Sequence, residues 1–258
     1  RTALAFSGQD GSLKHLLITS AARGEGKSLS SVNVAIALAQ AGKRVLLVDA
    51  DMRKPRLHKI FRINPNPGLS NILAGQESSS LADIIRPVPE VENLHVLPCG
   101  PLPPNPAELL QSKRMKELLG EINDGFDIAV FDTPPLVNVT DAAVLSQYVS
   151  NVIIVVRSFS TQREIMCRAK DIIMETNSRV LGLVLNNVDA PRNRYLSYYY
   201  GYYYAYGNDE DGGKTQKRQR RKAGKRGGNS ENPQPPSGDA PRRKVCRPKI
   251  EKADLRKG

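Results

Sequence analysis

The segment Leu16–Ser28 reads LLITSAARGEGKS and leads from an apolar run into a glycine-containing loop. It fits the P-loop pattern G-x-x-x-x-G-K-[ST], with Ala21 in place of the first glycine. Small residues let the backbone N–H groups of such a loop converge on a phosphate, and the following helix adds partial positive charge. Lys27 can bridge the β- and γ-phosphates of a nucleotide, while the Ser28 hydroxyl can complete a Mg²⁺ shell. The flanking strand and helix disfavour the alternative, an ordinary glycine-rich turn.

Residues 1–207 alternate apolar runs with helical segments, which is typical of one α/β domain. Most of these runs are continuous rather than alternating, so helices must cover both faces of the sheet. We predict a three-layer P-loop NTPase fold with a mostly parallel central sheet, in which ligands bind beyond the carboxyl ends of the strands. The expected strands are His15–Thr19, Arg44–Val48, Leu94–Leu97, Ile128–Phe131, Val152–Val156 and Val180–Leu185. The expected helices are Leu29–Ala41 (ending at Gly42), Pro55–Phe61, Leu81–Ile85, Pro106–Glu121, Asp141–Tyr148 and Gln162–Glu175, with loops at 62–80 and 98–106.

Carboxylates follow two of the expected strands. Asp49 and Asp51 follow the apolar run of VLLVDADMRKP (45–55), and Asp132 follows that of DIAVFDTPP (127–135). At the carboxyl ends of neighbouring parallel strands, these side chains converge near the phosphate loop. One or two of them can bind Mg²⁺, and a third can accept a proton from a nucleophile. Each aspartate taken alone is equally suited to capping a helix or forming a turn.

The net charge of +12 is concentrated at the end of the chain. Residues 208–258 hold 16 basic and 7 acidic residues, whereas residues 1–207 have a net charge of only +3. Because this end has no aromatic and few aliphatic residues, it cannot bury enough apolar area to offset its loss of conformational entropy. We expect 208–258 to be a disordered basic tail. Its runs Lys214–Arg226 and Arg242–Lys244 suit a solvated tail or an anionic surface, and the lack of interleaved aromatic residues argues against specific nucleic-acid binding.

The cysteine content and the hydropathy pattern indicate a cellular compartment. Cys99, Cys167 and Cys246 are odd in number, widely spaced and without a metal-ligand pattern, which favours a reducing cytoplasm over a secreted disulfide framework. No apolar run approaches the roughly 18 to 20 residues needed to cross a bilayer. Since the chain begins at Arg1 without Met, we expect a fragment, with any membrane anchor outside it.

Residues 195–206 read YLSYYYGYYYAY and hold eight of the nine tyrosines in the chain. One interpretation is a strand, or a stacking platform for nucleic acid. Unbroken tyrosines do not alternate with apolar positions, however, and a buried sheet would need a partner for every hydroxyl. An exposed array of phenols beside a nucleotide site instead favours a role as phosphate acceptors. The candidate acceptors are Tyr195, Tyr198, Tyr199, Tyr200, Tyr202, Tyr203, Tyr204 and Tyr206.

Together these motifs resemble those of the bacterial tyrosine kinases of capsule and exopolysaccharide systems, over about residues 1–207. The resemblance rests on SAARGEGKS (20–28) as Walker A, VLLVDADMRKP (45–55) as Walker A′, IAVFDTPP (128–135) as Walker B, and the terminal tyrosine cluster. Arg1-Thr2 is similar to the end of the family's self-association helix, E-x-x-R-x-x-R-T-N, with Ala3 where Asn is common. The H-R-D and D-F-G patterns of other protein kinases are absent from the sequence.

The resemblance implies a non-specific protein-tyrosine kinase that uses ATP and Mg²⁺. Lys27 and Ser28 would bind ATP·Mg²⁺, and Asp49 and Asp132 would hold or orient the metal. Asp51 would help to activate the phenol. The implied catalytic residues are Lys27, Asp51 and Asp49. The implied ATP-binding residues are Ala22, Arg23, Gly24, Glu25, Gly26, Lys27, Ser28, Leu29 and Asn186, and the implied metal ligands are Ser28, Asp49 and Asp132.

The resemblance also implies an organisation and a cellular setting. Residues 1–194 would be the catalytic domain, 195–207 the tyrosine cluster and 208–258 the tail. Copies in a ring-like or other homo-oligomer would phosphorylate each other, and sugar-nucleotide enzymes would be further substrates. A transmembrane activator or a fused polysaccharide co-polymerase domain would hold the kinase at the cytoplasmic face of the plasma membrane, where it would regulate polymer synthesis and export.

Two other functions compete with this interpretation. Partition or septum-positioning ATPases share the fold but carry an additional lysine at the position of Ala22, which this chain lacks. A non-catalytic, nucleotide-gated scaffold would use the basic tail to bind nucleic acid or lipid. Arg53, Lys54 and Arg56 suit contact with phosphate, contact with a neighbouring subunit, or simple solvation. Asn186 suits an adenine contact or a turn about equally.

Overall fold

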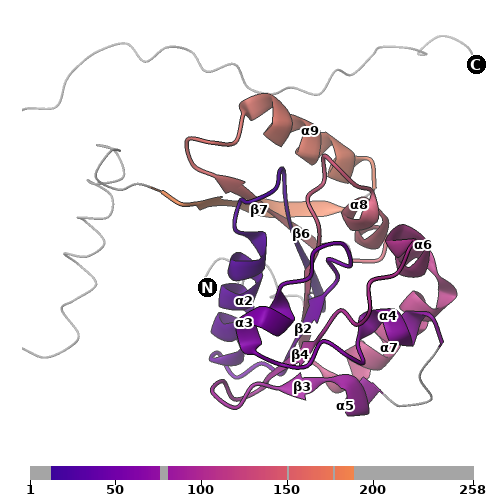
Figure 1. Ribbon diagram of the computed structural model, residues 1–258. Helices are drawn as coiled ribbons and strands as arrows, with labels where there is room; N and C mark the ends of the chain where they lie inside the picture. Colours follow the sequence, from indigo (N-terminus) through magenta and orange to yellow (C-terminus); the bar gives the residue numbers. More distant parts are fainter. Residues whose placement is uncertain (1–12, 76–80, 150, 177, 189–258) are drawn as a thin grey trace, which may run out of the picture. The chain divides into compact units, whose positions relative to one another are not determined.

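The computed structural model describes residues 13–75, 81–149, 151–176 and 178–188 (Figure 1). In this part of the chain, seven strands form one sheet in the order β3-β4-β2-β5-β1-β6-β7. All neighbours pair in parallel except β3 and β4, which are antiparallel. The strands are β1 (His15–Ser20), β2 (Val45–Asp49), β3 (Arg86–Pro87), β4 (Leu94–Leu97), β5 (Ile128–Asp132), β6 (Asn151–Arg157) and β7 (Arg179–Asn186).

Helices cover both faces of the sheet, as the continuous apolar strands require. On one face, Val32 and Ala35 belong to the same buried cluster as Leu16 and Ile18 of β1. On the other face, several helices pack over a cluster that includes Phe131 of β5. The first face carries α2 (Lys27–Ala39) and α3 (Leu57–Phe61), and the second carries α4 (Leu69–Leu73), α6 (Pro106–Gln111), α7 (Lys113–Gly125), α8 (Asp141–Ser146) and α9 (Arg163–Met174), while the short α5 (Leu81–Ile84) precedes β3. The predicted three-layer fold is therefore confirmed.

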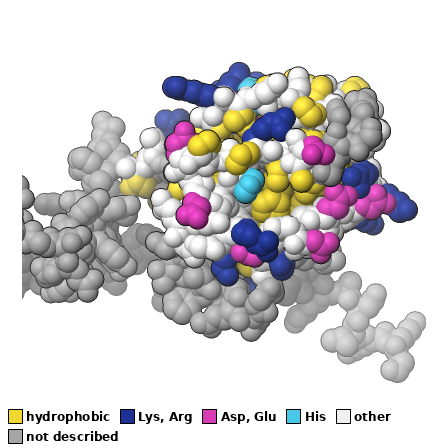
Figure 2. Space-filling view, turned by 90° about the horizontal axis from the view of Figure 1, so that it is seen from below, with side chains coloured by type: hydrophobic (Ala, Val, Ile, Leu, Met, Phe, Trp, Pro, Cys, Tyr) yellow, Lys and Arg dark blue, Asp and Glu magenta, His cyan; other side chains and the backbone are white. Residues whose placement is uncertain are grey.

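One face of the described surface carries mixed side chains, and the described helices fall short of what a membrane span requires. Figure 2 shows the face beneath β3 and α5, where hydrophobic side chains gather between acidic and basic ones. None of the helices in the described ranges combines the length and the hydropathy that crossing a bilayer requires.

All six predicted strands are present, but one predicted helix is wrong. The segment Pro106–Glu121 is two helices, because Ser112 adopts an extended conformation (φ −64°, ψ 158°) between α6 and α7. The Ser112 hydroxyl accepts a hydrogen bond from the backbone N–H of Met115, so this serine caps the start of α7. Serine favours such a position over a helix interior because its side chain competes for backbone hydrogen bonds.

The two segments predicted as loops, 62–80 and 98–106, are hydrogen-bonded to each other. Within 62–80, residues 69–73 form α4, and the N–H groups of Leu69 and Ser70 each donate to a carbonyl of the 98–106 segment at 2.8 Å. Gly68 approaches the backbone of this second segment so closely that an added Cβ would lie 2.2 Å from Gly100 N. In their described parts, the two segments are therefore fixed connections of the fold.

The sheet register places the acidic residues together. Asp49 ends β2 opposite Asp132, which ends β5, and Ile18 of β1 pairs with Asp132 from the other side. The loop after β1 thus lies beside both carboxylates. The boundary predicted at 194, the tyrosine cluster and the basic tail lie outside the described residues.

Candidate active site

The loop between β1 and α2 has the backbone conformation of a phosphate-binding loop. Gly24 and Gly26 have φ values of 78° and 88°, in the left-handed region that favours glycine. Helix α2 begins at Lys27, directly after Gly26, so its free N–H groups and partial positive charge lie at the end of the loop. This arrangement suits a phosphate group.

Gly26 is the position in the loop where a side chain has least room. An added Cβ would lie 2.0 Å from Nδ2 of Asn186, and its backbone conformation is strained for any other residue. We expect Gly26→Ala to lose most nucleotide binding and to lower the free energy of unfolding by roughly 1–2 kcal/mol. Gly42→Ala is the matched control, since Gly42 has a similar φ of 82° but open space around its Cβ position. Wild-type ATP affinity in the Gly26 variant, measured by calorimetry, would contradict this account of the loop.

The Glu25 side chain points into the protein and holds the loop. Glu25 is 3% exposed, and its carboxylate accepts the backbone N–H of Ala22 at 2.8 Å. The hydroxyl of Thr161, in the turn after β6, donates to the other carboxylate oxygen. The Nδ2 atom of Asn186, at the end of β7, donates to the carbonyl of Glu25 at 2.9 Å. The loop is therefore bound to the ends of two neighbouring strands.

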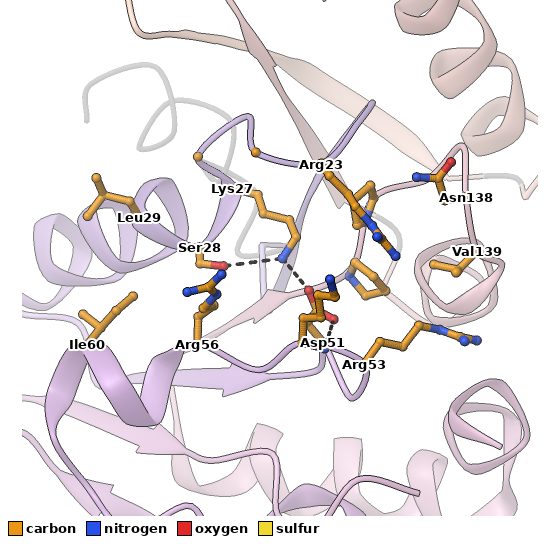
Figure 3. A pocket seen from close by; sticks show the side chains of 15 residues that line it. Arg23, Lys27, Ser28, Leu29, Asp51, Arg53, Arg56, Ile60, Asn138 and Val139 are labelled. Atoms are coloured by element: carbon orange, nitrogen blue, oxygen red, sulfur yellow. Dashed lines mark hydrogen bonds and ion pairs between the residues drawn. The ribbon is translucent and has the colours of Figure 1, made fainter. Parts of the chain in front are cut away.

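Lys27 joins the phosphate loop to the carboxylates. Its Nζ lies 2.7 Å from Oδ2 of Asp51 and 3.8 Å from Oδ1 of Asp132, and it also donates to the Ser28 hydroxyl at 3.4 Å. Figure 3 shows the lysine extending from the start of α2 toward Asp51. Because Lys27 is the only cation ion-paired with these two carboxylates in the described part of the chain, it carries the charge balance of the site.

Asp49 and Asp132 lie at the bottom of the site, fully buried. Oδ2 of Asp49 accepts the backbone N–H groups of Arg56 and Leu57 at 3.1 and 2.9 Å, so this carboxylate also fixes the start of α3. Burial, together with repulsion from Asp132, raises the pKa of Asp49 to about 7, and burial also raises the pKa of Asp132. Oδ1 of Asp49 and Oδ2 of Asp132 are buried without a hydrogen-bond partner among the described residues.

These unpartnered oxygens fit a bound Mg²⁺. Mg²⁺ prefers oxygen ligands and is usually held by one or two carboxylates, substrate phosphates and water. No group of three or more His, Cys, Asp or Glu side chains in the described ranges forms a metal-binding cluster, so the protein would supply only part of the shell. The unpartnered oxygens of Asp49 and Asp132, together with the Ser28 hydroxyl, could supply that part.

A cavity of about 440 Å³ opens beside the loop. Asp51 lines it together with most of the predicted ATP-binding residues, namely Arg23, Gly24, Gly26, Lys27, Ser28 and Leu29 (Figure 3). Ala22, Glu25 and Asn186, also predicted to bind ATP, are not in its lining, and the hydrogen bonds above place them in the support of the loop.

Further residues line the cavity that the sequence motifs did not identify as binding residues. Arg53, Lys54 and Arg56, whose role the sequence left open, line it from the segment after β2. Asn138 and Val139 line it from the segment after β5, and the sequence analysis missed both. Their position shortly after Asp132, beyond the carboxyl end of a strand, is the signal that could have identified them.

Comparisons with known proteins identify the family. A family model described as an AAA domain matches residues 14–180. The tyrosine-protein kinase YwqD of Bacillus subtilis is 40% identical over 199 residues, which cover 77% of this chain and 83% of YwqD. The tyrosine-protein kinase ptk of Acinetobacter johnsonii is 38% identical over 188 residues, which cover 73% of this chain but only 25% of ptk.

Solved structures agree with these relatives. The kinase domain of the Escherichia coli tyrosine kinase ETK aligns with a TM-score of 0.69 and 33% identity, covering 73% of this chain and 72% of that domain. The cell division ATPase MinD of Pyrococcus furiosus aligns with a TM-score of 0.58 and 23% identity, covering 68% of this chain and 74% of MinD, which supports the fold alone. The partition or septum ATPase alternative therefore rests only on shared architecture, and the chain belongs to the family of bacterial tyrosine kinases.

Proposed function

We propose that this kinase transfers the γ-phosphate of ATP to the tyrosines of residues 195–206, from one copy of the chain to another, and also to other proteins. The observation that carries this proposal is the Lys27–Asp51 pair, 2.7 Å apart at the wall of the active-site cavity. It combines a cation for the phosphates with a carboxylate for the proton of the acceptor. The sequence supplies the acceptors, since eight tyrosines stand together in 195–206.

In the proposed reaction, a phenol oxygen forms a bond to the γ-phosphorus of ATP, and the bond from that phosphorus to the β-phosphate oxygen breaks. A phenol has a pKa of about 10, so its proton must leave as the new bond forms. The Asp51 carboxylate accepts that proton, and ADP departs with the bond electrons. When phosphates engage Lys27, the lysine is drawn from Asp51, which frees the carboxylate to act as the base.

The remaining side chains position and neutralise charge. The loop N–H groups and Lys27 bind the phosphate oxygens, which stabilises the charge that spreads over them during transfer. Ser28, Asp49 and Asp132 would hold Mg²⁺, which would supply positive charge to neutralise the phosphates. Arg23 lines the same cavity and adds positive charge at its mouth.

We place this activity in capsule or exopolysaccharide synthesis and export, at the cytoplasmic face of the bacterial plasma membrane. The length of ptk, of which this chain matches 25%, supports a kinase that is fused to, or works with, a transmembrane activator or polysaccharide co-polymerase domain. Each phosphate adds about −1.5 to −2 charges, so a heavily phosphorylated cluster would be repelled from the acidic site. Phosphorylation would then loosen an oligomer of kinases, and sugar-nucleotide enzymes would be further substrates.

The acceptor assignment is tested by replacing all eight cluster tyrosines with Phe. Phe keeps the ring but lacks the hydroxyl that receives phosphate, so we expect autophosphorylation to lose most of its signal while ATP affinity is unchanged. Tyr148, the ninth tyrosine, serves as the matched control, and Tyr148→Phe should leave the signal intact. Phosphotyrosine at wild-type levels in the eightfold variant, measured by mass spectrometry, would overturn the assignment.

A further inference from the structure

A second cavity, of about 500 Å³, adjoins the active site on the side of α3. The two cavities share Arg53, Lys54 and Arg56, and the second also includes Lys59 of α3. Its opposite wall comes from the two connecting segments 62–80 and 98–106, around Asn66 and 100–102. A chain that leaves the active site on this side therefore enters the second cavity directly.

The charge in this second cavity is of one sign. Its lining contains four Lys and Arg residues and no Asp or Glu. Arg53 is already neutralised, because it forms two hydrogen bonds of 2.8 and 2.9 Å with the buried carboxylate of Asp141. Lys54, Arg56 and Lys59 are exposed and form no ion pair with any described residue. We call these three residues the basic rim.

Another surface cavity, of about 510 Å³, lacks this character. It lies near α5 and is lined by Leu81, Ile85, His95 and Phe126, with one Arg and one Glu at its edge. Figure 2 shows acidic and basic side chains of this face interspersed among hydrophobic ones. A surface of mixed sign selects no particular charged ligand. Three cations beside the active site that have no ion-pair partner among the described residues favour an anion.

The sequence contains one segment that matches the basic rim. Asp209-Glu210-Asp211 is the only run of three consecutive acidic residues in the chain, and it begins three residues after Tyr206, the last tyrosine of the cluster. Three extended residues span at most about 10–11 Å. A tyrosine in the active-site cavity and an acidic run in the adjoining cavity are therefore compatible with one continuous peptide.

We propose that the basic rim, Lys54, Arg56 and Lys59, docks the acidic run Asp209–Asp211 of the kinase chain and so presents the preceding tyrosines to the active site. This inference rests on the proposed function, because it concerns how the acceptor segment is held. The acidic run supplies three negative charges to three cations that have no other ion-pair partner in the described part of the chain. The run thus increases the affinity for the acceptor segment without taking part in the chemistry.

Two acceptor peptides test the docking. One spans residues 195–213, and the other has the same sequence with D209N, E210Q and D211N, which removes the charge and keeps the shape. The enzyme is the full chain carrying these same three substitutions, so that its own acidic run does not compete. We expect the KM for the acidic peptide to be about tenfold lower, with kcat unchanged, since exposed ion pairs each contribute modestly. The difference should disappear in 1 M salt, where the Debye length is about 3 Å.

A charge reversal on the enzyme locates the site. Lys59 lines the second cavity and not the active-site cavity, so Lys59→Glu should keep the wild-type rate on the neutral peptide but reduce the tenfold difference to about threefold or less. Lys113→Glu is the control, because Lys113 is also exposed but begins α7 on the opposite face of the sheet, where it pairs with Glu117. It makes the same change in net charge and should leave the tenfold difference intact.

The possible outcomes distinguish a failure of the docking proposal from a failure of the proposed kinase function. If neither peptide is phosphorylated, the proposed function itself is wrong. If both are phosphorylated with equal KM, the function stands and the docking is overturned. A tenfold difference that Lys59→Glu and Lys113→Glu leave equally intact would also overturn the docking, because the acidic run would then bind elsewhere, as on the basic stretch Lys214–Arg226.

Discussion

Lys27→Met should lower the rate of autophosphorylation by at least about 10³-fold, in the range expected for loss of a cation that stabilises phosphoryl transfer. Lys27 is the residue that contacts both Asp51 and Asp132, and it begins α2 at the end of the phosphate-binding loop. Met has a similar length but no charge, so it cannot neutralise the γ-phosphate. It also leaves the neighbouring carboxylates to repel the nucleotide.

The loss of activity in this variant must be separated from unfolding. Removing the lysine leaves the nearly buried Asp51 and the buried Asp132 without their ion pair, so the thermal midpoint should also fall. Circular dichroism and the cooperativity of thermal unfolding establish that the chain is folded at the assay temperature. Phosphotyrosine that persists in the pure, folded Lys27→Met protein would remove this lysine from the mechanism.

Asp132→Asn should stabilise the ligand-free protein while abolishing kinase activity. Asp49, Asp51 and Asp132 are all buried, and Lys27 pairs with only two of them, Asp51 and Asp132, so the ligand-free site holds excess negative charge. The amide keeps an oxygen that can accept the hydrogen bond now donated by Ser31, but it removes one charge. We expect the free energy of unfolding to rise by about 1–2 kcal/mol at pH 8. Activity should be lost because the variant lacks a carboxylate for Mg²⁺.

The raised pKa of Asp49 also predicts how the free energy of unfolding changes with pH. The pKa of Asp49 rises from 3.8 to about 7 on folding, so the folded chain binds more protons than the unfolded chain between these values. The free energy of unfolding should therefore decrease as the pH rises from about 4 to about 7. Asp132→Asn removes one cause of that shift and should flatten the curve. If chemical denaturation shows the variant to be less stable than the wild type at pH 8, the carboxylate is stabilising and this account of the site is wrong.

The sheet and the phosphate loop were predictable because their signals are local. The continuous apolar strands, such as Leu46–Val48, can only be buried on both faces, and the loop glycines occupy conformations that glycine favours. The break at Ser112 was missed because the apolar pattern continues across it, and only the cap geometry ends α6 there. The two-residue strand β3 is too short to produce a periodic pattern.

The supporting contacts of the site depend on tertiary neighbours that a sequence does not reveal. Glu25 was assigned to ATP by its place in the loop, yet its carboxylate accepts from Ala22 and from Thr161, which lies 136 residues away. Asp49 was assigned to the metal, and its second contact, at the start of α3, depends on how the chain turns after β2. Motifs therefore identified which residues gather at the site, whereas the structure showed which of their atoms are already in use.

The central claim is that this chain passes the γ-phosphate of ATP to its own tyrosine cluster. Mass spectrometry of peptides from the purified chain, before and after incubation with ATP and Mg²⁺, tests it most directly. We predict that phosphate accumulates on the tyrosines of 195–206 in the wild type and is absent from the folded Lys27→Met protein. Hydrolysis of ATP with no phosphate on 195–206 would contradict the claim and would indicate an ATPase on the same fold.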